Sequence, residues 1–237
     1  MASLSQVLRW EIALQARSFI YPATVVSTLM ICGFLSVLPV EQLSPAWVTF
    51  FVFIDPAMIG LSFVGAIILM EKSEGTILAV GVSPMEPGLY IAAKVISLTL
   101  VTFASGLAVA YVAADDFLLI RMLLTLTLSS TVAVLVGFAC AARAPSMNKL
   151  TITLLWVSMI AYAPLLTHFG VLPESLTPLI ALIPSYAVLL LLESCVSTSP
   201  FDSTLLIASF GYLVAWVVAG WLWASREYLA NITTEGR

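Results

Sequence analysis

The chain has 237 residues, of which 61% are hydrophobic and 9% are charged, and its formal net charge is −4. Because soluble domains carry roughly a quarter charged residues, this composition excludes an ordinary soluble enzyme and predicts a membrane protein. No basic cluster indicates a nucleic-acid partner. The three cysteines, Cys32, Cys140 and Cys195, show no paired spacing, so neither a disulfide framework nor a metal site is expected.

Apolar runs long enough to cross a bilayer recur along the chain. A spanning helix needs about 20 apolar residues, because each residue rises about 1.5 Å. We therefore predict an all-α polytopic membrane protein with six transmembrane helices in a single domain over residues 1–237. The predicted spans are Phe19–Leu38, Trp47–Met70, Leu89–Ala113, Phe117–Ala142, Leu150–Thr167 and Thr204–Ala224.

The positive charges orient these spans. Lysine and arginine stay on the cytoplasmic side during insertion. With both termini in the cytoplasm, Arg121 is the single positive residue of the nine that falls outside. The eight that fall inside are Arg9, Arg17, Lys72, Lys94, Arg143, Lys149, Arg226 and Arg237.

A further apolar run, Leu179–Cys195, is interrupted by Pro184. Counting it as a span would place Arg226 and Arg237 outside, against the charge asymmetry. The proline also lacks a backbone donor, which bare lipid cannot replace. We predict that the outer region, residues 168–203, contains a re-entrant or outer-leaflet element that does not cross.

An N-terminal helix is predicted over about residues 1–18. The segment Ser3-Leu4-Ser5-Gln6 resembles a capping box, which marks a helix start. Glu11 and Gln15 interrupt the apolar face of this helix, so its amphipathicity is weak. Trp10 and Arg17 suit a position at the membrane interface.

The predicted cytoplasmic loop, residues 71–88, combines charge with an apolar stretch. Its apolar part, Thr76–Val82, precedes a helix-start pattern in which Ser83 is the N-cap and Pro84 the first helical residue. Apolar residues exposed to the cytosol usually mark a contact. From the residues alone, three readings stay open: docking of a partner, packing within the chain, and burial in the lipid interface.

Asp55 is a carboxylate well inside the second predicted span. An ionisable residue at such depth is a candidate functional site, here a contact for a cationic or zwitterionic substrate. The alternative is structural, because Asp55 followed by Pro56 is also typical of an N-cap and first helical residue.

Several catalytic motifs are missing from the sequence. We find no Gly-x-x-x-x-Gly-Lys-Ser/Thr loop, no His-Glu-x-x-His and no Gly-x-Ser-x-Gly. We therefore do not expect the chain to be an enzyme, and ATP hydrolysis through a phosphate-binding loop would need another subunit.

The loop residues carry a resemblance to a known family. The pattern Glu71…Glu74-Gly75-Thr76…Ser83-Pro84…Tyr90…Lys94 after the second span resembles the type-2 ATP-binding-cassette (ABC) exporter permeases. Asp55-Pro56, followed by Gly60 and Gly65, is similar to the branch that exports fluoroquinolones and other drugs. The chain departs from the family at Ile77, where leucine is usual, and at Ala92-Ala93, where Leu-Gly is common.

The resemblance implies a permease domain whose loop, residues 71–88, contains a coupling helix that docks on a separate ABC ATPase. No cofactor would be bound directly, since ATP and Mg would act through that partner. The N-terminal helix would lie along the cytoplasmic leaflet, with packing on the ATPase as the alternative. The implied ATPase-coupling residues are Glu71, Glu74, Gly75, Thr76, Ile77, Leu78, Val80, Ser83 and Pro84.

The resemblance also implies a pathway between two such units in a bacterial plasma membrane, formed by a homodimer or by a heterodimer with a paralogous permease. Its second and fifth spans would line a path for hydrophobic or amphipathic small molecules, including drugs. The implied path residues are Asp55, Phe51, Phe63, Trp156, Met159 and Tyr162. Simple exposure of the apolar ones to lipid is the alternative. The competing functions are a proton-coupled transporter without an ATPase and a membrane enzyme.

Overall fold

The computed structural model describes residues 3–38, 44–76, 86–114, 116–197 and 201–231, and every regular element in these ranges is helical. The all-α fold class is confirmed. The helices are α1 (Leu4–Arg17), α2 (Ile20–Val37), α3 (Pro45–Ser73), α5 (Pro87–Ala113), α6 (Leu119–Arg143), α7 (Met147–His168), the 3₁₀ turn η2 (Glu174–Leu176), α8 (Thr177–Ile180), α9 (Pro184–Val196) and α10 (Ser203–Asn231).

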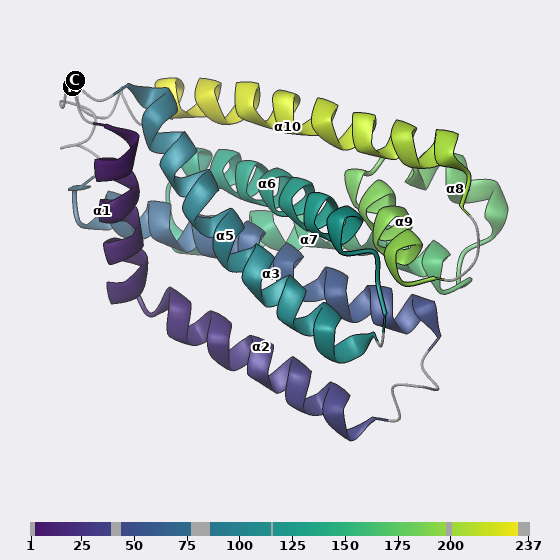
Figure 1. Ribbon diagram of the computed structural model, residues 1–237. Helices are drawn as coiled ribbons and strands as arrows, with labels where there is room; N and C mark the ends of the chain where they lie inside the picture. The colour runs from purple at the N-terminus through teal and green to yellow at the C-terminus, as the bar shows by residue number, and fades with distance from the viewer. Residues whose placement is uncertain (1–2, 39–43, 77–85, 115, 198–200, 232–237) are drawn as a thin grey trace.

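Five of these helices, α2, α5, α6, α7 and α10, are long and apolar enough to cross a membrane. The remaining long helix, α3, has 29 residues, and the side chains of residues 55–59 lie outside the described part of the chain. The helices pack side by side along a common direction, whereas α1 lies across one end of the bundle (Figure 1). The chain is therefore a multi-pass membrane protein.

The two ends of the bundle are defined by contacts between helix termini. At one end, Lys72 Nζ donates to the carbonyl oxygen of Ala142 at 2.8 Å, and Arg143 pairs with Glu227 at 3.6 Å. The C-terminal ends of α3, α6 and α10 thus meet there, beside α1 (Figure 1). We call this the basic end.

At the opposite end, a ring nitrogen of His168 lies 3.3 Å from the carbonyl oxygen of Ala46, and the backbone N–H of Leu118 donates to the carbonyl of Cys195 at 3.0 Å. The end of α7 therefore meets the start of α3, and the end of α9 meets the start of α6. Arg121, the one positive residue predicted to lie outside, is at this end, where it donates to the carbonyl oxygen of Ser194 at 2.9 Å.

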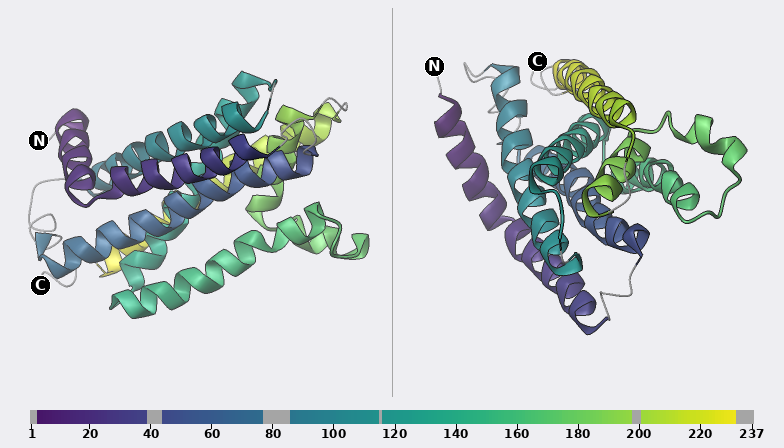
Figure 2. Two further views of the ribbon diagram at one scale, coloured as in Figure 1. Left: turned by 90° about the horizontal axis from the view of Figure 1, so that it is seen from below. Right: turned by 45° about the vertical axis from the view of Figure 1, so that its right-hand side comes forward.

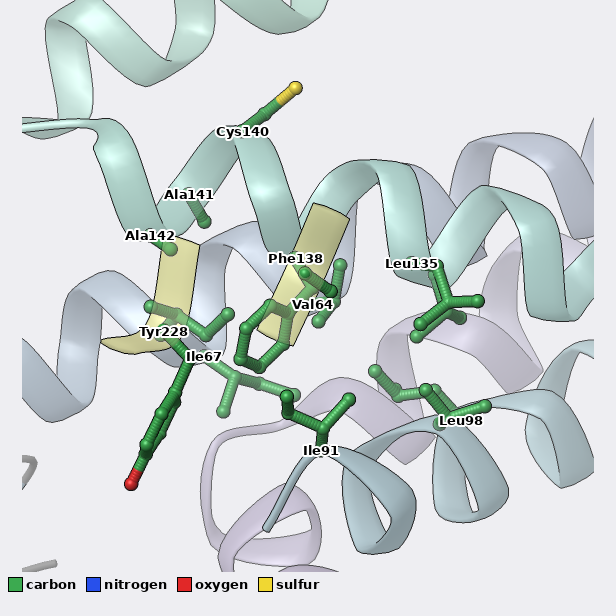
Figure 3. Close-up of a cluster of buried hydrophobic side chains, with 14 of the residues drawn as sticks. Val64, Ile67, Ile91, Leu98, Leu135, Phe138, Cys140, Ala141, Ala142 and Tyr228 are labelled. Atoms are coloured by element: carbon green, nitrogen blue, oxygen red, sulfur yellow. The ribbon is translucent and has the colours of Figure 1, made fainter. Parts of the chain in front are cut away.

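The core near the basic end forms where α3, α5, α6 and α10 meet, as the clustered side chains in Figure 3 show. Helices α3 and α6 approach each other closely at Gly137. A Cβ atom placed on Gly137 would lie 2.5 Å from the backbone oxygen of Leu61 and 2.6 Å from a methyl carbon of Val64. Glycine at this position lets the two backbones approach, which buries the surrounding apolar side chains.

The segment between α7 and α10 leaves and returns at the same end of the bundle. α9 has 13 residues, and Pro184 occupies its first turn, where the missing backbone donor does no harm. Near its C-terminal end, Glu193 lies 3.5 Å from His168 at the end of α7. Pro184 therefore starts a short helix instead of interrupting a longer one.

Candidate functional site

A cluster of buried ionisable side chains joins three helices near the basic end. Lys94 Nζ of α5 lies 2.8 Å from Glu11 Oε1 of α1 and 2.7 Å from Glu71 Oε1 of α3. All three side chains are at most 1% exposed. The hydroxyl of Tyr90, one turn before Lys94, donates to Glu71 Oε2. We call Glu11, Glu71, Tyr90 and Lys94 the lysine cluster.

Two polar residues, Glu11 and Gln15, interrupt the apolar face of α1 and position this helix on the bundle. Glu11 and Gln15 lie one turn apart and are both 0% exposed. Gln15 Nε2 donates to Ser97 Oγ of α5 at 2.6 Å, and its Oε1 accepts from the Tyr21 hydroxyl at 3.0 Å. The weak amphipathicity of α1 thus has a structural cause, because its buried face contacts polar partners on α5.

The lysine cluster contains one more negative than positive group when both carboxyls are ionised. Glu11 Oε2 is buried and has no hydrogen-bond partner among the described residues. Burial raises the pKa of the Glu11 carboxyl above its ordinary value, and the neighbouring Lys94 ammonium opposes that shift only in part. Lys94 Nζ also lies 4.6 Å from the centre of the Tyr90 ring, a cation–π contact that further stabilises the ammonium.

The predicted coupling residues lie in different environments in the structure. Glu71 is buried inside the chain, whereas Glu74, just after the end of α3, is exposed. Gly75 has φ +70°, a left-handed conformation that glycine adopts without strain, so the chain turns sharply there. Thr76 follows and is half-buried. Ile77, Leu78, Val80, Ser83 and Pro84 lie outside the described residues.

The predicted path residues do not gather in one place. Phe51 belongs to an aromatic group with Phe34, Trp47 and Phe50 at the end opposite the basic end. Phe63 is half-buried against the core. Of the other four, Trp156 and Met159 are exposed on α7 and Tyr162 is half-buried there. The side chain of Asp55 lies outside the described part of the chain.

Helix α7 lies at the edge of the bundle, as the left view of Figure 2 shows. Only Leu150 and Pro164 of its described side chains are buried. Its exposed apolar face includes Leu155, Trp156, Met159 and Ile160, each more than half exposed. This face is available for lipid or for another protein.

Tyr162 also borders a cavity of about 290 Å³ between α3, α6, α7, α9 and α10. The cavity is lined almost wholly by apolar and aromatic side chains, with a few serine hydroxyls and one tyrosine hydroxyl among them. Small-molecule sites commonly have this character. Sequence reasoning did not find the cavity, because it depends on where α9 packs.

These features define a multi-pass membrane protein with a bundle of apolar helices, a buried ion cluster at one end and an apolar cavity within. The chain matches the family of fluoroquinolones export permease proteins over residues 2–235, and it belongs to that family. The resemblance to the drug-export branch of the ABC exporter permeases is thereby confirmed.

Two curated relatives are both described as fluoroquinolones export permease proteins of Mycobacterium tuberculosis, one from strain CDC 1551 and one from strain H37Rv. Each is 30% identical to this chain over 207 residues, which cover 85% of this chain and 86% of the relative. The similarity therefore extends over nearly the whole bundle, and it identifies a transport protein of the efflux type.

Proposed function

We propose that the chain is the transmembrane subunit of an ABC exporter that moves hydrophobic or amphipathic small molecules out of the cell, powered by a separate ATPase subunit. Family membership supports export, and the names of the two relatives support fluoroquinolones among the cargo. ATP and Mg act through the partner.

The observation that carries the coupling proposal is the buried pair of Glu71 and Lys94. These residues lie near the end of α3 and the start of α5, on either side of residues 77–85. Removing a charge from such a pair is strongly unfavourable, so the two helices are held together where the loop leaves and returns. Force applied to the loop is then transmitted to α3 and α5 together, and through Glu11 to α1.

Within this proposal the polar residues have different tasks. Glu71 positions the helices from inside the chain, and the exposed Glu74 contacts the ATPase. Gly75 turns the chain away from α3, and Ile77, Leu78 and Val80 form the apolar centre of the docking surface, where water is excluded. Ser83 and Pro84 begin the segment that leads back to α5.

The proposed topology has six crossings, made by α2, α3, α5, α6, α7 and α10. The basic end is cytoplasmic, because positive residues are retained on that side. Helix α1 lies along the cytoplasmic leaflet, and α9 re-enters from the outside without crossing. The protein is placed in a bacterial plasma membrane with both termini in the cytoplasm.

The proposed transport path lies between two permease subunits, identical or paralogous, that meet along the exposed face of α7. Trp156 and Met159 would then line the path, together with residues of α3 such as Phe63 and Asp55. Such apolar and aromatic surfaces suit hydrophobic cargo.

The coupling proposal is tested by Leu78→Asp, which places an unpaired charge in the docking surface at a cost of several kcal/mol. The variant is expected to insert normally, to lose the ATPase in detergent pull-downs and to lose transport. Leu176→Asp, an exposed leucine at the opposite end, is the matched control and should retain both. Co-purification of Leu78→Asp with the ATPase at wild-type stoichiometry, together with normal transport, would contradict the proposal.

A further inference from the structure

Helix α9 begins beside the apolar cavity, at half-buried residues, without a side-chain cap. Its N-cap is Ile183, whose side chain cannot accept a hydrogen bond, and Pro184 follows. The first N–H groups of a helix have no partner within the helix, and they carry the positive end of its dipole. Pro184 has no N–H, and the N–H of Tyr186 donates to the carbonyl oxygen of Ile183 at 3.0 Å. The backbone N–H of Ser185 is therefore the donor of this first turn that is without a partner among the described residues.

A second polar group at the same place is also without a partner. Ser185, in the first turn of α9, is 8% exposed, and its hydroxyl oxygen is buried with no hydrogen-bond partner among the described residues. Buried hydroxyls are normally paired, because leaving one unpaired is unfavourable. Ser185 lines the apolar cavity between α3, α6, α7, α9 and α10. The cavity therefore has an unused donor in its wall beside an uncapped helix start.

The rest of the wall suits an aromatic body. Phe53, Tyr162, Trp216 and Trp223 contribute rings to the lining, and the other lining residues are aliphatic or carry only small hydroxyls. Aromatic walls hold flat rings through stacked and edge-to-face contacts. Ile160 and Trp223 line the cavity and are 59% and 36% exposed, so the cavity opens to the side of the bundle between α7 and α10.

We propose that this cavity is a binding site for a neutral aromatic molecule bearing a carbonyl group. The carbonyl oxygen accepts from the Ser185 hydroxyl at the start of α9, and the ring lies among the aromatic side chains. A carbonyl suits this place because its oxygen has two lone pairs and can accept from both the hydroxyl and the backbone N–H of Ser185. The molecule is neutral because no charged side chain of the lining could compensate a buried carboxylate, and one hydroxyl with a helix dipole does not replace its hydration.

The site lies within one subunit and adjoins the proposed path, since Ile160 of the exposed α7 face also lines the cavity. The role of this site rests on the proposed export function in one respect: its ligand would be cargo that arrives from the membrane. The lateral opening suits that role, since a membrane-dissolved compound could enter between α7 and α10. Binding itself requires neither the ATPase nor a second subunit.

The test measures saturable binding to the purified permease in detergent, corrected for partition into empty micelles. The probes are 2-acetylnaphthalene, which has the carbonyl, 2-ethylnaphthalene, which has nearly the same shape without it, and 2-naphthoate, which carries a charge. Wild type is expected to prefer the acetyl over the ethyl compound, and both over the naphthoate. Ser185→Ala is expected to weaken acetylnaphthalene binding about fivefold to tenfold and to leave ethylnaphthalene binding unchanged.

Two further variants distinguish binding of the probes at this cavity from a general effect of mutation on their affinity. Ser130→Ala removes a buried hydroxyl that already donates to the Leu126 carbonyl at 2.6 Å, and it should leave the preference for the acetyl compound intact. Ala161→Phe fills the cavity from α7 and should abolish saturable binding of both naphthalenes.

An equal affinity for the acetyl and ethyl compounds in wild type, or a preference that survives Ser185→Ala, would overturn the proposal. So would binding that Ala161→Phe leaves intact, or displacement of all probes by phospholipid without dependence on Ser185, which would indicate an acyl-chain pocket. Because the ATPase is absent from this assay, failure here leaves the coupling proposal standing, and failure of coupling leaves this site standing.

Discussion

Replacing Lys94 with methionine tests whether the lysine cluster holds the basic end together. In the wild type, one fully buried ammonium faces Glu11 Oε1 at 2.8 Å and Glu71 Oε1 at 2.7 Å. Methionine keeps most of the side-chain volume but leaves two buried carboxylates without a counter-ion. Removing one partner of a buried pair typically lowers the free energy of unfolding by about 3–5 kcal/mol. We expect about 4 kcal/mol here, because both carboxylates lose the same partner.

The assay is thermal or denaturant unfolding of the purified permease in detergent. Lys149→Met, at an exposed position near the start of α7, is the control and should change stability little. The triple variant, which adds Glu11→Gln and Glu71→Gln to Lys94→Met, removes the unpaired charges and should recover most of the loss. If Lys94→Met unfolds within about 0.5 kcal/mol of Lys149→Met, the cluster does not hold these helices.

Three other predictions concern the cluster, the packing and the topology. Because burial raises the folded-state pKa of the Glu11 carboxyl above its ordinary value of 4.5, the stability linked to its protonation is present below that value and is lost as pH rises through the folded-state pKa. Between pH 5 and pH 8, the free energy of unfolding of Glu11→Gln should therefore rise relative to that of wild type as pH rises. A difference between the two proteins that stays constant with pH would contradict the raised pKa. Gly137→Ala should destabilise by about 1–3 kcal/mol through overpacking, whereas Gly33→Ala, with open space around its Cβ, should be neutral or stabilising in the same unfolding assay. Single cysteines at Asp116 and Ser146, in a cysteine-free background, should differ toward an impermeant thiol reagent in intact cells, with Asp116 labelled and Ser146 protected; the reverse pattern would invert the topology.

The apolar helices could be predicted from the sequence because span length and hydropathy are local properties. The predicted spans over Phe117–Ala142 and Leu150–Thr167 overlap almost completely with α6 and α7. Pro184 was correctly expected to prevent one long helix, because its effect on the backbone is also local.

The lysine cluster could not be assembled from the sequence, because Glu11 and Lys94 are 83 positions apart and meet only through packing of α1 on α5. Some sequence features did point to the cluster. Glu11 and Gln15 interrupted an apolar face at one-turn spacing, and Lys94 stood within a predicted span, where a charge needs a partner. Tyr90 and Lys94 were recognised as part of the family pattern without a role, and the structure brings both to Glu71.

The uncapped start of α9 was beyond sequence reasoning for a different reason. The sequence identified Pro184 only as an interruption of an apolar run, and only the packing of α9 beside the cavity leaves the Ser185 hydroxyl without a partner among the described residues. A hydroxyl near the surface would have been hydrated. Burial, and not residue type, makes this position a candidate site.

The central claim is that export by this permease is driven by an ATPase docked at the loop between α3 and α5. The most direct test is uptake of a fluoroquinolone into inside-out proteoliposomes that contain the permease with the ABC ATPase proposed as its partner. We predict uptake that requires ATP and the ATPase, that continues when the proton gradient is collapsed, and that is lost with Leu78→Asp. Uptake by the permease alone, driven by a proton gradient and unchanged by Leu78→Asp, would contradict it.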